Sequence, residues 1–146
     1  MDRDQTANNL ELMTTAFAAL NAGELDRCQE LLTEDFVINL FGLPVPLQGR
    51  DIWRQNVDAM YRSFPDLHAE IDDIFGSNDR VAVRLTFQGT HREEFQGVPA
   101  THREVTYQSL ELYRMADGKI AEEWIASDIA SLMSQLSPEN EASLHG

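Results

Sequence analysis

The sequence has a single cysteine, few basic residues and no long hydrophobic run. Cys28 alone cannot form an internal disulfide, and its place in LDRCQELL favours a small thiol on a helix face over a nucleophile. No window approaches the roughly 18–20 consecutive apolar residues of a membrane-spanning helix, and the start lacks the basic flank and apolar run of a secretory signal. These absences exclude a disulfide framework and predict a cytoplasmic protein.

Basic residues are outnumbered by acidic ones, 11 against 25, which gives a formal net charge of −14. A chain of this charge repels phosphate backbones and anionic lipid surfaces over a screening length of roughly 8–10 Å. We therefore expect neither nucleic acid nor a membrane as a partner. The acidity otherwise indicates solubility rather than a particular function.

Motifs for several kinds of catalysis are also missing. There is no Gly-rich phosphate loop and no Gly-x-Ser-x-Gly turn, which argues against nucleotide binding and acyl-enzyme chemistry. His91 and Glu93 form the His-x-Glu pair seen in zinc deaminases, but no Pro-Cys-x-x-Cys follows, and the four histidines lack metal-binding spacing. The sequence predicts no metal and no cofactor.

The first half of the chain has the apolar spacing of helices. Leu10, Met13, Phe17 and Leu20 predict a helix over residues 8–20. The segments that follow are a brief helical pattern over 25–32, a short strand and a Pro/Gly-broken loop within 35–46, and a third helix from about 49–51 to Pro65.

The second half is rich in β-branched and aromatic residues. Four strands are predicted, at 68–75, 80–89, 104–115 and 119–126, and Asp117-Gly118 predicts that the last two form a hairpin. A final apolar stripe from Ile129 to Leu136 predicts a closing helix. This order predicts one α+β domain over residues 1–136, with helices on one face of a curved antiparallel sheet, and a polar mobile tail over 137–146.

Several motifs cluster between residues 89 and 136. GTHREEFQGVPATHREV contains Gly-x-His and Gly-x-Pro-x-Thr, and LYRMADGKIAEEWIASDIASLMSQL contains Arg-x-x-Asp-Gly-Lys-Ile, an acid-x-Trp strand and a terminal Gln-Leu. Together with Phe17, Gly49 and Phe64, they resemble the SnoaL-like polyketide cyclase and ester cyclase family. The resemblance implies a cone-shaped fold like that of nuclear transport factor 2, commonly a homodimer through the outer face of the sheet.

The resemblance also implies a chemistry. In the cyclases of this family, a pocket acid moves a proton at a carbon next to a carbonyl so that an intramolecular aldol bond closes a ring, and no cofactor is needed. A carboxyl group buried among apolar side chains has the raised pKa that such a role requires. The family's catalytic aspartate position falls on Ile125 here, and a second polar family position falls on Ile38, beside Asn39.

Three other side chains are therefore candidates for proton transfer. Asp128 opens the final helix, where it could equally cap backbone N–H groups. Glu111 lies between two leucines, so alternation places it toward solvent, whereas the resemblance places it inside the cone; we favour the inside. His91 shares strand parity with Phe87 and could face the pocket, or be a strand-end histidine bonded to backbone.

Further residues are expected to shape a pocket for a small apolar or aromatic molecule, although a helix stripe of this kind could equally be ordinary core. They are Trp53, Met60, Phe64, Phe87, Tyr107, Ser109, Glu123 and Ile125. The leading hypothesis is a cofactor-independent cyclase or isomerase for a polyketide-like or other apolar carbonyl compound. The alternative is a non-catalytic small-molecule-binding domain of the same fold, which the apolar Ile38 and Ile125 favour.

Overall fold

The computed structural model describes residues 3–137. Most of the predicted tail lies outside the described residues, and only Ser137 of it is included. The elements in chain order are α1 (Arg3–Asn21), α2 (Leu25–Glu30), β1 (Leu32–Leu40), β2 (Leu47–Gln48), α3 (Arg50–Ser63), β3 (His68–Ser77), β4 (Arg80–Thr90), β5 (Glu104–Ala116), β6 (Lys119–Ser127) and α4 (Ile129–Leu136). None of the described helices is both long and apolar enough to cross a membrane.

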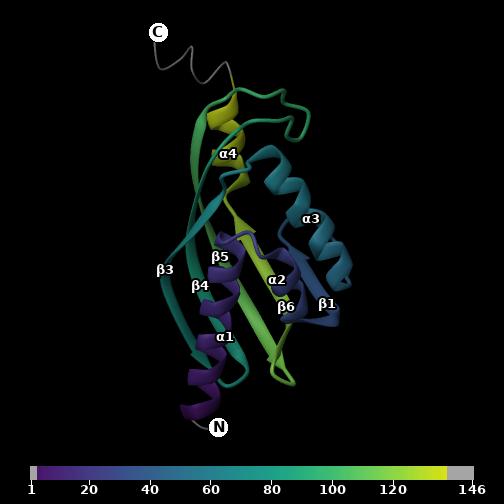
Figure 1. Cartoon of the computed structure of the whole chain (residues 1–146), viewed down its shortest axis with the longest axis vertical. Helices are drawn as coiled ribbons and strands as arrows, with labels where there is room; N and C mark the ends of the chain where they lie inside the picture. The colour runs from purple at the N-terminus through teal and green to yellow at the C-terminus, as the bar shows by residue number, and fades with distance from the viewer. Residues whose placement is uncertain (1–2, 138–146) are drawn as a thin grey trace.

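The strands form one sheet of six in the order β2-β1-β6-β5-β4-β3. All neighbours are antiparallel except β1 and β6, which are parallel. The sheet is bent, and α1 and α3 lie on its concave side (Figure 1). Helix α1 packs on β3 and β4, whereas α3 packs on β1 and β2. This is the α+β cone predicted from the sequence.

Local sequence explains where the elements begin and end. Helix α3 ends at Ser63, just before Phe64 and Pro65, because the residue before a proline disfavours helical geometry. Asp117 and Gly118 turn the chain between β5 and β6 with φ of 55° and 75°, a left-handed pair typical of a two-residue hairpin. The predicted hairpin and closing helix are confirmed, and α1 is longer than predicted at both ends.

The inner face of the sheet carries the core in two apolar clusters. One lies between α1, β1 and the central strands and includes Phe36, Met13 and Tyr113. The other lies between the end of α3, the β4–β5 loop and α4, and includes Phe64 and Leu132. The two clusters divide the concave face into a lower part beneath α1 and an upper part beneath α4 (Figure 1).

Candidate functional site

Strand β5 places a row of polar side chains on the concave face of the sheet. Its buried residues alternate along the strand, and Ser109, Glu111 and Tyr113 are the consecutive members of the inner row. Glu123 on β6 lies directly opposite Tyr113 in the register, so it shares this face. Glu111 is only 7% exposed and Glu123 only 4%. Two carboxyl groups are therefore withdrawn from water on the same wall.

Hydroxyl groups hold both oxygens of the Glu111 carboxyl. Ser109 Oγ donates to Oε2 over 2.7 Å, and the Tyr113 hydroxyl donates to Oε1. Ser127 Oγ lies 2.8 Å from Ser109 Oγ. Because the Ser109 proton is directed at the carboxylate, Ser127 is the donor in that contact. A chain of hydroxyls thus stabilises the ionised form of Glu111.

The environments of the two carboxyl groups differ. Burial raises the pKa of Glu111, and the hydrogen bonds from Tyr113 and Ser109 oppose that rise. Burial raises the pKa of Glu123 well above its ordinary range, the Glu111 charge raises it further, and only Tyr113 opposes. The Tyr113 hydroxyl interacts with both carboxyls, and its own pKa is raised by burial and by their charges. The pair therefore favours an ionised Glu111 beside a protonated Glu123.

Apolar side chains surround this polar cluster. Val83 on β4 and Ile125 on β6 lie opposite Glu111 from its two sides, and Ile38 on β1 lies beside Glu123. The ring of Phe17 meets the Tyr113 ring edge-on, with 6.3 Å between centroids. The low polarity of these walls is the cause of the raised pKa values. Ile125 and Ile38, where the resemblance to the cyclase family implies polar residues, both belong to the wall of this cluster.

His91 lies far from Glu111, at the upper end of β4. Val83 is the β4 residue opposite Glu111, and the eight residues from there to His91 span on the order of 26 Å of strand. The ring of His91 is fully buried and stacks on Phe64, with 5.4 Å between ring centroids. Its Nδ1 accepts from the backbone N–H of Thr101 over 3.1 Å, which puts the ring proton on Nε2.

The contacts of His91 explain the Gly-x-His and Gly-x-Pro-x-Thr motifs. The Nδ1 of His91 also lies 3.0 Å from the Thr101 hydroxyl. The histidine of the Gly-x-His motif therefore fixes the loop that contains the Gly-x-Pro-x-Thr motif. Burial lowers the pKa of His91, which keeps the ring neutral. Within the described residues its Nε2 has no hydrogen-bond partner. These contacts support the backbone-bonded alternative for His91.

Gly89 precedes this histidine and lies against the end of α3. A Cβ at this position would meet Leu67 Cδ1 at 3.3 Å and Phe64 Cβ at 3.4 Å. We expect Gly89→Val to lower the free energy of unfolding by about 1–3 kcal/mol, because two further methyl groups must enter filled space. Urea denaturation measures the loss. Gln88→Val, on the outer face of the same strand, is the control, and an equal loss in both variants would contradict the packing argument.

Asp128 occupies the N-cap of α4. It is exposed, and its Oδ1 accepts from the backbone N–H of Ser131 over 3.0 Å. It follows Ser127 directly, yet its carboxyl is bound to the helix rather than to the Glu111 cluster. The geometry supports the capping alternative.

We expect Asp128→Ala to lower the free energy of unfolding by about 1 kcal/mol through loss of the cap. Asp128→Asn keeps a capping oxygen and should restore most of that stability. Thermal melting of the three proteins checks both statements. If alanine leaves the melting temperature unchanged, the cap interpretation is wrong.

The predicted wall residues divide between the two clusters. Phe87 and Tyr107 stack with 5.1 Å between centroids, and Met60 and Phe64 pack with them in the upper cluster. Trp53 packs against the lower cluster, which contains Tyr113. The structure therefore brings Ser109, Glu111, Glu123 and Ile125 together on the lower wall, and places the aromatic residues mainly above it.

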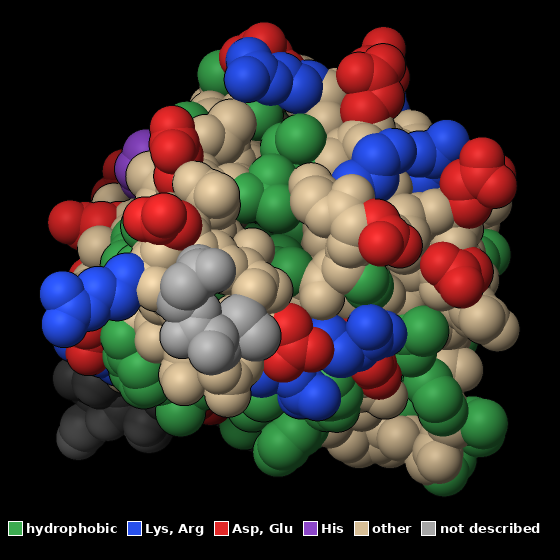
Figure 2. Space-filling model, turned by 90° about the horizontal axis from the view of Figure 1, so that it is seen from below, with side chains coloured by type: hydrophobic (Ala, Val, Ile, Leu, Met, Phe, Trp, Pro, Cys, Tyr) green, Lys and Arg blue, Asp and Glu red, His purple; other side chains and the backbone are tan. Residues whose placement is uncertain are grey.

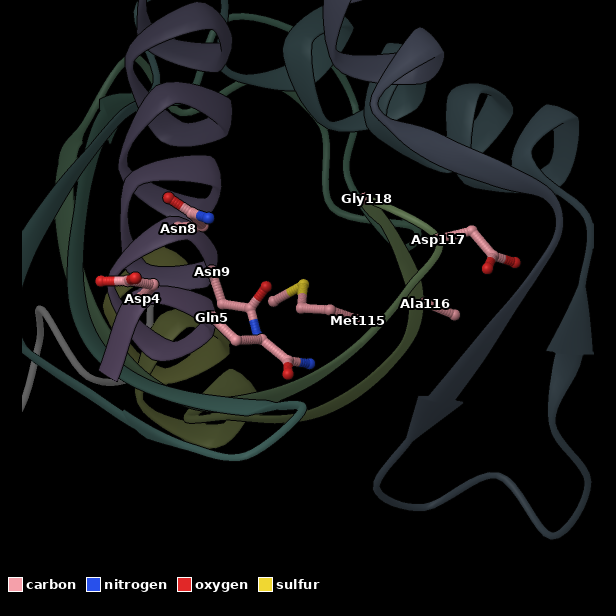
Figure 3. A pocket seen from close by; sticks show the side chains of 8 residues that line it. All are labelled: Asp4, Gln5, Asn8, Asn9, Met115, Ala116, Asp117 and Gly118. Carbon is pink, nitrogen blue, oxygen red and sulfur yellow. The ribbon is translucent and has the colours of Figure 1, made fainter. Parts of the chain in front are cut away.

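Two open depressions mark the surface of the described residues. One lies where the first turns of α1 meet the β5–β6 hairpin and has Met115 and Asn9 in its lining (Figure 3). The other lies around α2 and Arg54. Neither is lined by Glu111, Glu123 or His91.

Sequence reasoning missed Tyr113. Its side chain connects the two buried carboxyls, but the residue sits in LYRM, between the hairpin motif and Glu111, and has the pattern of an ordinary strand aromatic. Its parity with Glu111, two residues away, was the one available signal.

The bent sheet with helices on its concave side has the arrangement of the nuclear transport factor 2-like fold. The chain belongs to the SnoaL-like polyketide cyclase family, whose model matches residues 10–136. No protein with a curated description matches the sequence.

Solved structures agree with this family. IdmH of Streptomyces antibioticus, described as a candidate polyketide cyclase, is 33% identical, with a TM-score of 0.79, over 88% of this chain and 97% of its own. AclR of Streptomyces galilaeus, described as a candidate hydroxylase, is 29% identical, with a TM-score of 0.82, over 90% and 96%. A SnoaL-like protein of Jannaschia sp. CCS1, 22% identical with a TM-score of 0.84 over 94% and 98%, shares the fold. Because these relatives carry different activity names, the reaction must be argued from the site.

Proposed function

We propose that this protein is a cofactor-independent cyclase or isomerase that moves a proton at a carbon next to a carbonyl group, in a polyketide-like or other apolar molecule. The observation that carries the proposal is the pair of buried glutamates, Glu111 and Glu123, connected by the hydroxyl of Tyr113. Membership of the SnoaL-like family supports a small-molecule ligand.

The two glutamates have complementary roles in this proposal. Glu111 is the ionised base and takes a proton from the carbon next to the carbonyl, so the electron pair moves to the carbonyl oxygen as an enolate. Glu123 is the protonated acid and donates to that oxygen. In a cyclisation, the enol carbon then attacks a second carbonyl of the same molecule, the enol O–H returns its proton to Glu123, and the new alkoxide takes the proton that Glu111 removed. Such positioned acid–base groups accelerate reactions by about 10²–10⁴-fold.

Glu111 compensates for the missing family aspartate. The aspartate position is Ile125, and Glu111 is its direct cross-strand neighbour on the same face. Side chains in such a pair lie about 5 Å apart at their Cβ atoms. A carboxyl on β5 therefore reaches the space that a carboxyl at position 125 of β6 would reach. His91 and Asp128 take no part in this proton transfer.

Exchange of carbon-bound hydrogen for deuterium tests the proposal without knowledge of the natural substrate. The probe is 2-tetralone, an apolar bicyclic ketone, in deuterated buffer, followed by proton NMR. The protein should accelerate the loss of the signals next to the carbonyl. Glu122→Gln changes the neighbouring acid, which lies in an ion pair with Arg114, and should retain the acceleration.

The second candidate function is non-catalytic binding of the same class of molecule. The apolar Ile38 and Ile125 in the wall of the cluster favour it. A protein that binds 2-tetralone but leaves its exchange rate at the buffer value would support this alternative and exclude the acid–base proposal.

We also propose that two copies pair through the outer face of the sheet. Both described long helices lie on the concave side (Figure 1), and Leu110 on the outer side of β5 is 60% exposed. Leu110→Glu should raise the dimer dissociation constant at least about tenfold, because it places charge in an apolar interface. Sedimentation velocity measures this, with Gln55→Glu at an exposed position of α3, away from the outer face of the sheet, as control. A wild-type monomer at all concentrations would exclude the dimer.

A further inference from the structure

The depression at the lower end of the molecule has the dimensions of a ligand passage. Its volume is about 350 Å³, and small-molecule sites commonly span roughly 300–1,000 Å³. Asp4, Gln5, Asn8 and Asn9 line it from α1, and Met115 and Asp117 from the hairpin. In Figure 3 the side chains of Gln5, Asn9 and Met115 converge from the two sides of the opening.

Met115 connects this depression to the buried glutamates. It belongs to the same inner row of β5 as Tyr113 and Glu111, and only 6% of it is exposed. Met115 lies four positions after Glu111, about 13 Å along the strand. It packs in the same apolar cluster as Tyr113. Seen from this end, hydrophobic side chains lie in a central hollow between polar ones (Figure 2).

Among the described residues, packed side chains close the upper end of the cone. Phe64 packs there with Leu132 and Leu136 of α4, and all three side chains are fully buried. The β4–β5 loop is fastened by the contact of His91 with Thr101, and Arg103 donates to the Gln135 carbonyl over 3.0 Å. Access at this end would require several fixed contacts to break, whereas at the lower end the buried side chain of Met115 lines the depression and packs in the same cluster as Tyr113.

We propose that the depression between α1 and the β5–β6 hairpin is the entrance to the Glu111 site, with Met115 as its movable gate. Methionine suits this role because it is unbranched and has three rotatable side-chain bonds. That the interior is an acid–base site rests on the function proposed above. The position of the entrance does not depend on that function.

The charges at this entrance restrict the ligand class. Asp4 and Asp117 line the opening, and no basic side chain is among the lining residues. Arg3 and Lys119, their neighbours in sequence, are exposed outside the lining. A carboxylate or phosphate would meet these two acids and then the Glu111–Glu123 pair. The entrance therefore favours neutral or cationic molecules over anions.

Cysteine modification tests the entrance. Met115→Cys, with Cys28→Ala to remove the native thiol, is treated with two methanethiosulfonates of similar size, one with a trimethylammonium and one with a sulfonate group. Gln55→Cys, at an exposed position of α3, controls for the overall negative charge. The preference of Met115→Cys for the cationic reagent should exceed that of the control by about tenfold. An equal preference would overturn the charge restriction.

Access is measured in the same experiment. Met115→Cys should react with the cationic reagent within minutes to hours while circular dichroism shows a folded protein. No reaction in the folded protein would overturn the entrance. Ala116→Cys, also in the lining, replaces Met115→Cys if that variant does not fold.

Gating is measured with the neutral fluorescent probe 1-aminoanthracene. Met115→Trp should slow its association at least about tenfold, because a rigid ring fills the gate, whereas Gln55→Trp on the exposed side of α3 should not. Unchanged association in Met115→Trp would overturn the gate.

If these results hold but Glu111→Gln leaves 2-tetralone exchange unchanged, the entrance stands and the acid–base function fails. If Glu111→Gln loses exchange but Met115→Cys does not react, the acid–base function stands and the entrance fails.

Discussion

Glu111→Gln is expected to lower the protein-catalysed deuterium exchange of 2-tetralone by about 10²–10⁴-fold, the share that a positioned base contributes. Glutamine has the size of glutamate and can still accept from Ser109, so the walls of the cluster are kept. It cannot take up a proton from carbon. The exchange rate by NMR and the melting temperature, measured on the same samples, separate loss of the base from loss of the fold.

The pH dependence of exchange gives a second signature of Glu111. The active form is the ionised one, and burial raises the pKa of this carboxyl. The rate should therefore rise with pH through a midpoint above the ordinary glutamate value of 4.5, and this rise should be absent in Glu111→Gln. Because Glu123 titrates with Glu111, the midpoint belongs to the pair. A midpoint at the ordinary value would mean that an exposed acid is the base.

Tyr113→Phe and Glu122→Gln complete this series. The first removes the hydroxyl that Glu111 and Glu123 share and should move the midpoint upward, since Glu111 loses a donor to its ionised form. The second changes an acid on the outer side of β6 and should leave both rate and midpoint as in the wild type. If Glu122→Gln and Glu111→Gln lowered the exchange rate equally, the cause would be the change in net charge and not the loss of a particular base.

Much of the fold could be predicted because local signals agree with it. The apolar spacing of α1, Pro65 after α3 and the Asp117-Gly118 turn each act within a few residues. The mixed pairing of the sheet is different in kind. Strand β1 joins β6 in parallel across some eighty residues of sequence, and only tertiary packing determines such a contact.

The neighbours of Glu111 could not be derived from the hairpin turn. Next to the turn, Ala116 pairs with Lys119 and Met115 pairs with Ile120. If this register continued without a break, Arg114 would lie opposite Ala121. The register instead shifts by one, so that Arg114 faces Glu122 and Tyr113 faces Glu123. This β-bulge decides which of the two adjacent glutamates points inward. A hairpin turn determines the strand register only up to the first β-bulge. In this hairpin the bulge lies between the turn and Glu111, so the turn does not determine which residues face Glu111.

Alternation along β5 was also misleading for Glu111. Leu110 and Leu112 flank it, so a simple hydrophobic pattern turns the leucines inward. The structure does the reverse: Glu111 is buried and Leu110 is exposed. The inner row includes apolar Val105 and Met115 at its ends, and the polar residues occupy its middle. Only the resemblance to the cyclase family indicated this orientation. The alternation pattern assumes that apolar residues face the core and charged residues face solvent, and a site that buries carboxyl groups violates this rule.

Glu123→Gln is expected to make the protein more stable than the wild type at pH 8, by an amount that grows with pH. Below the ordinary glutamate pKa of 4.5, Glu123 is protonated in both the folded and the unfolded chain, so its contribution is fully present. Above it, the unfolded chain ionises while the buried Glu123 keeps its proton, and folding loses about 1.4 kcal/mol per pH unit until the pH reaches the folded pKa. Glutamine has no such loss.

Urea denaturation of both proteins between pH 5 and pH 8 measures this difference. The net charge of −14 also weakens the folded state as pH rises, but it acts on every variant alike. Glu122→Gln, which removes one negative charge from the outer side of β6, therefore serves as the reference. Stability curves of Glu123→Gln and Glu122→Gln that run parallel to the wild type would show that Glu123 is ionised in the fold, and the proton donor of the proposed reaction would have to be sought elsewhere.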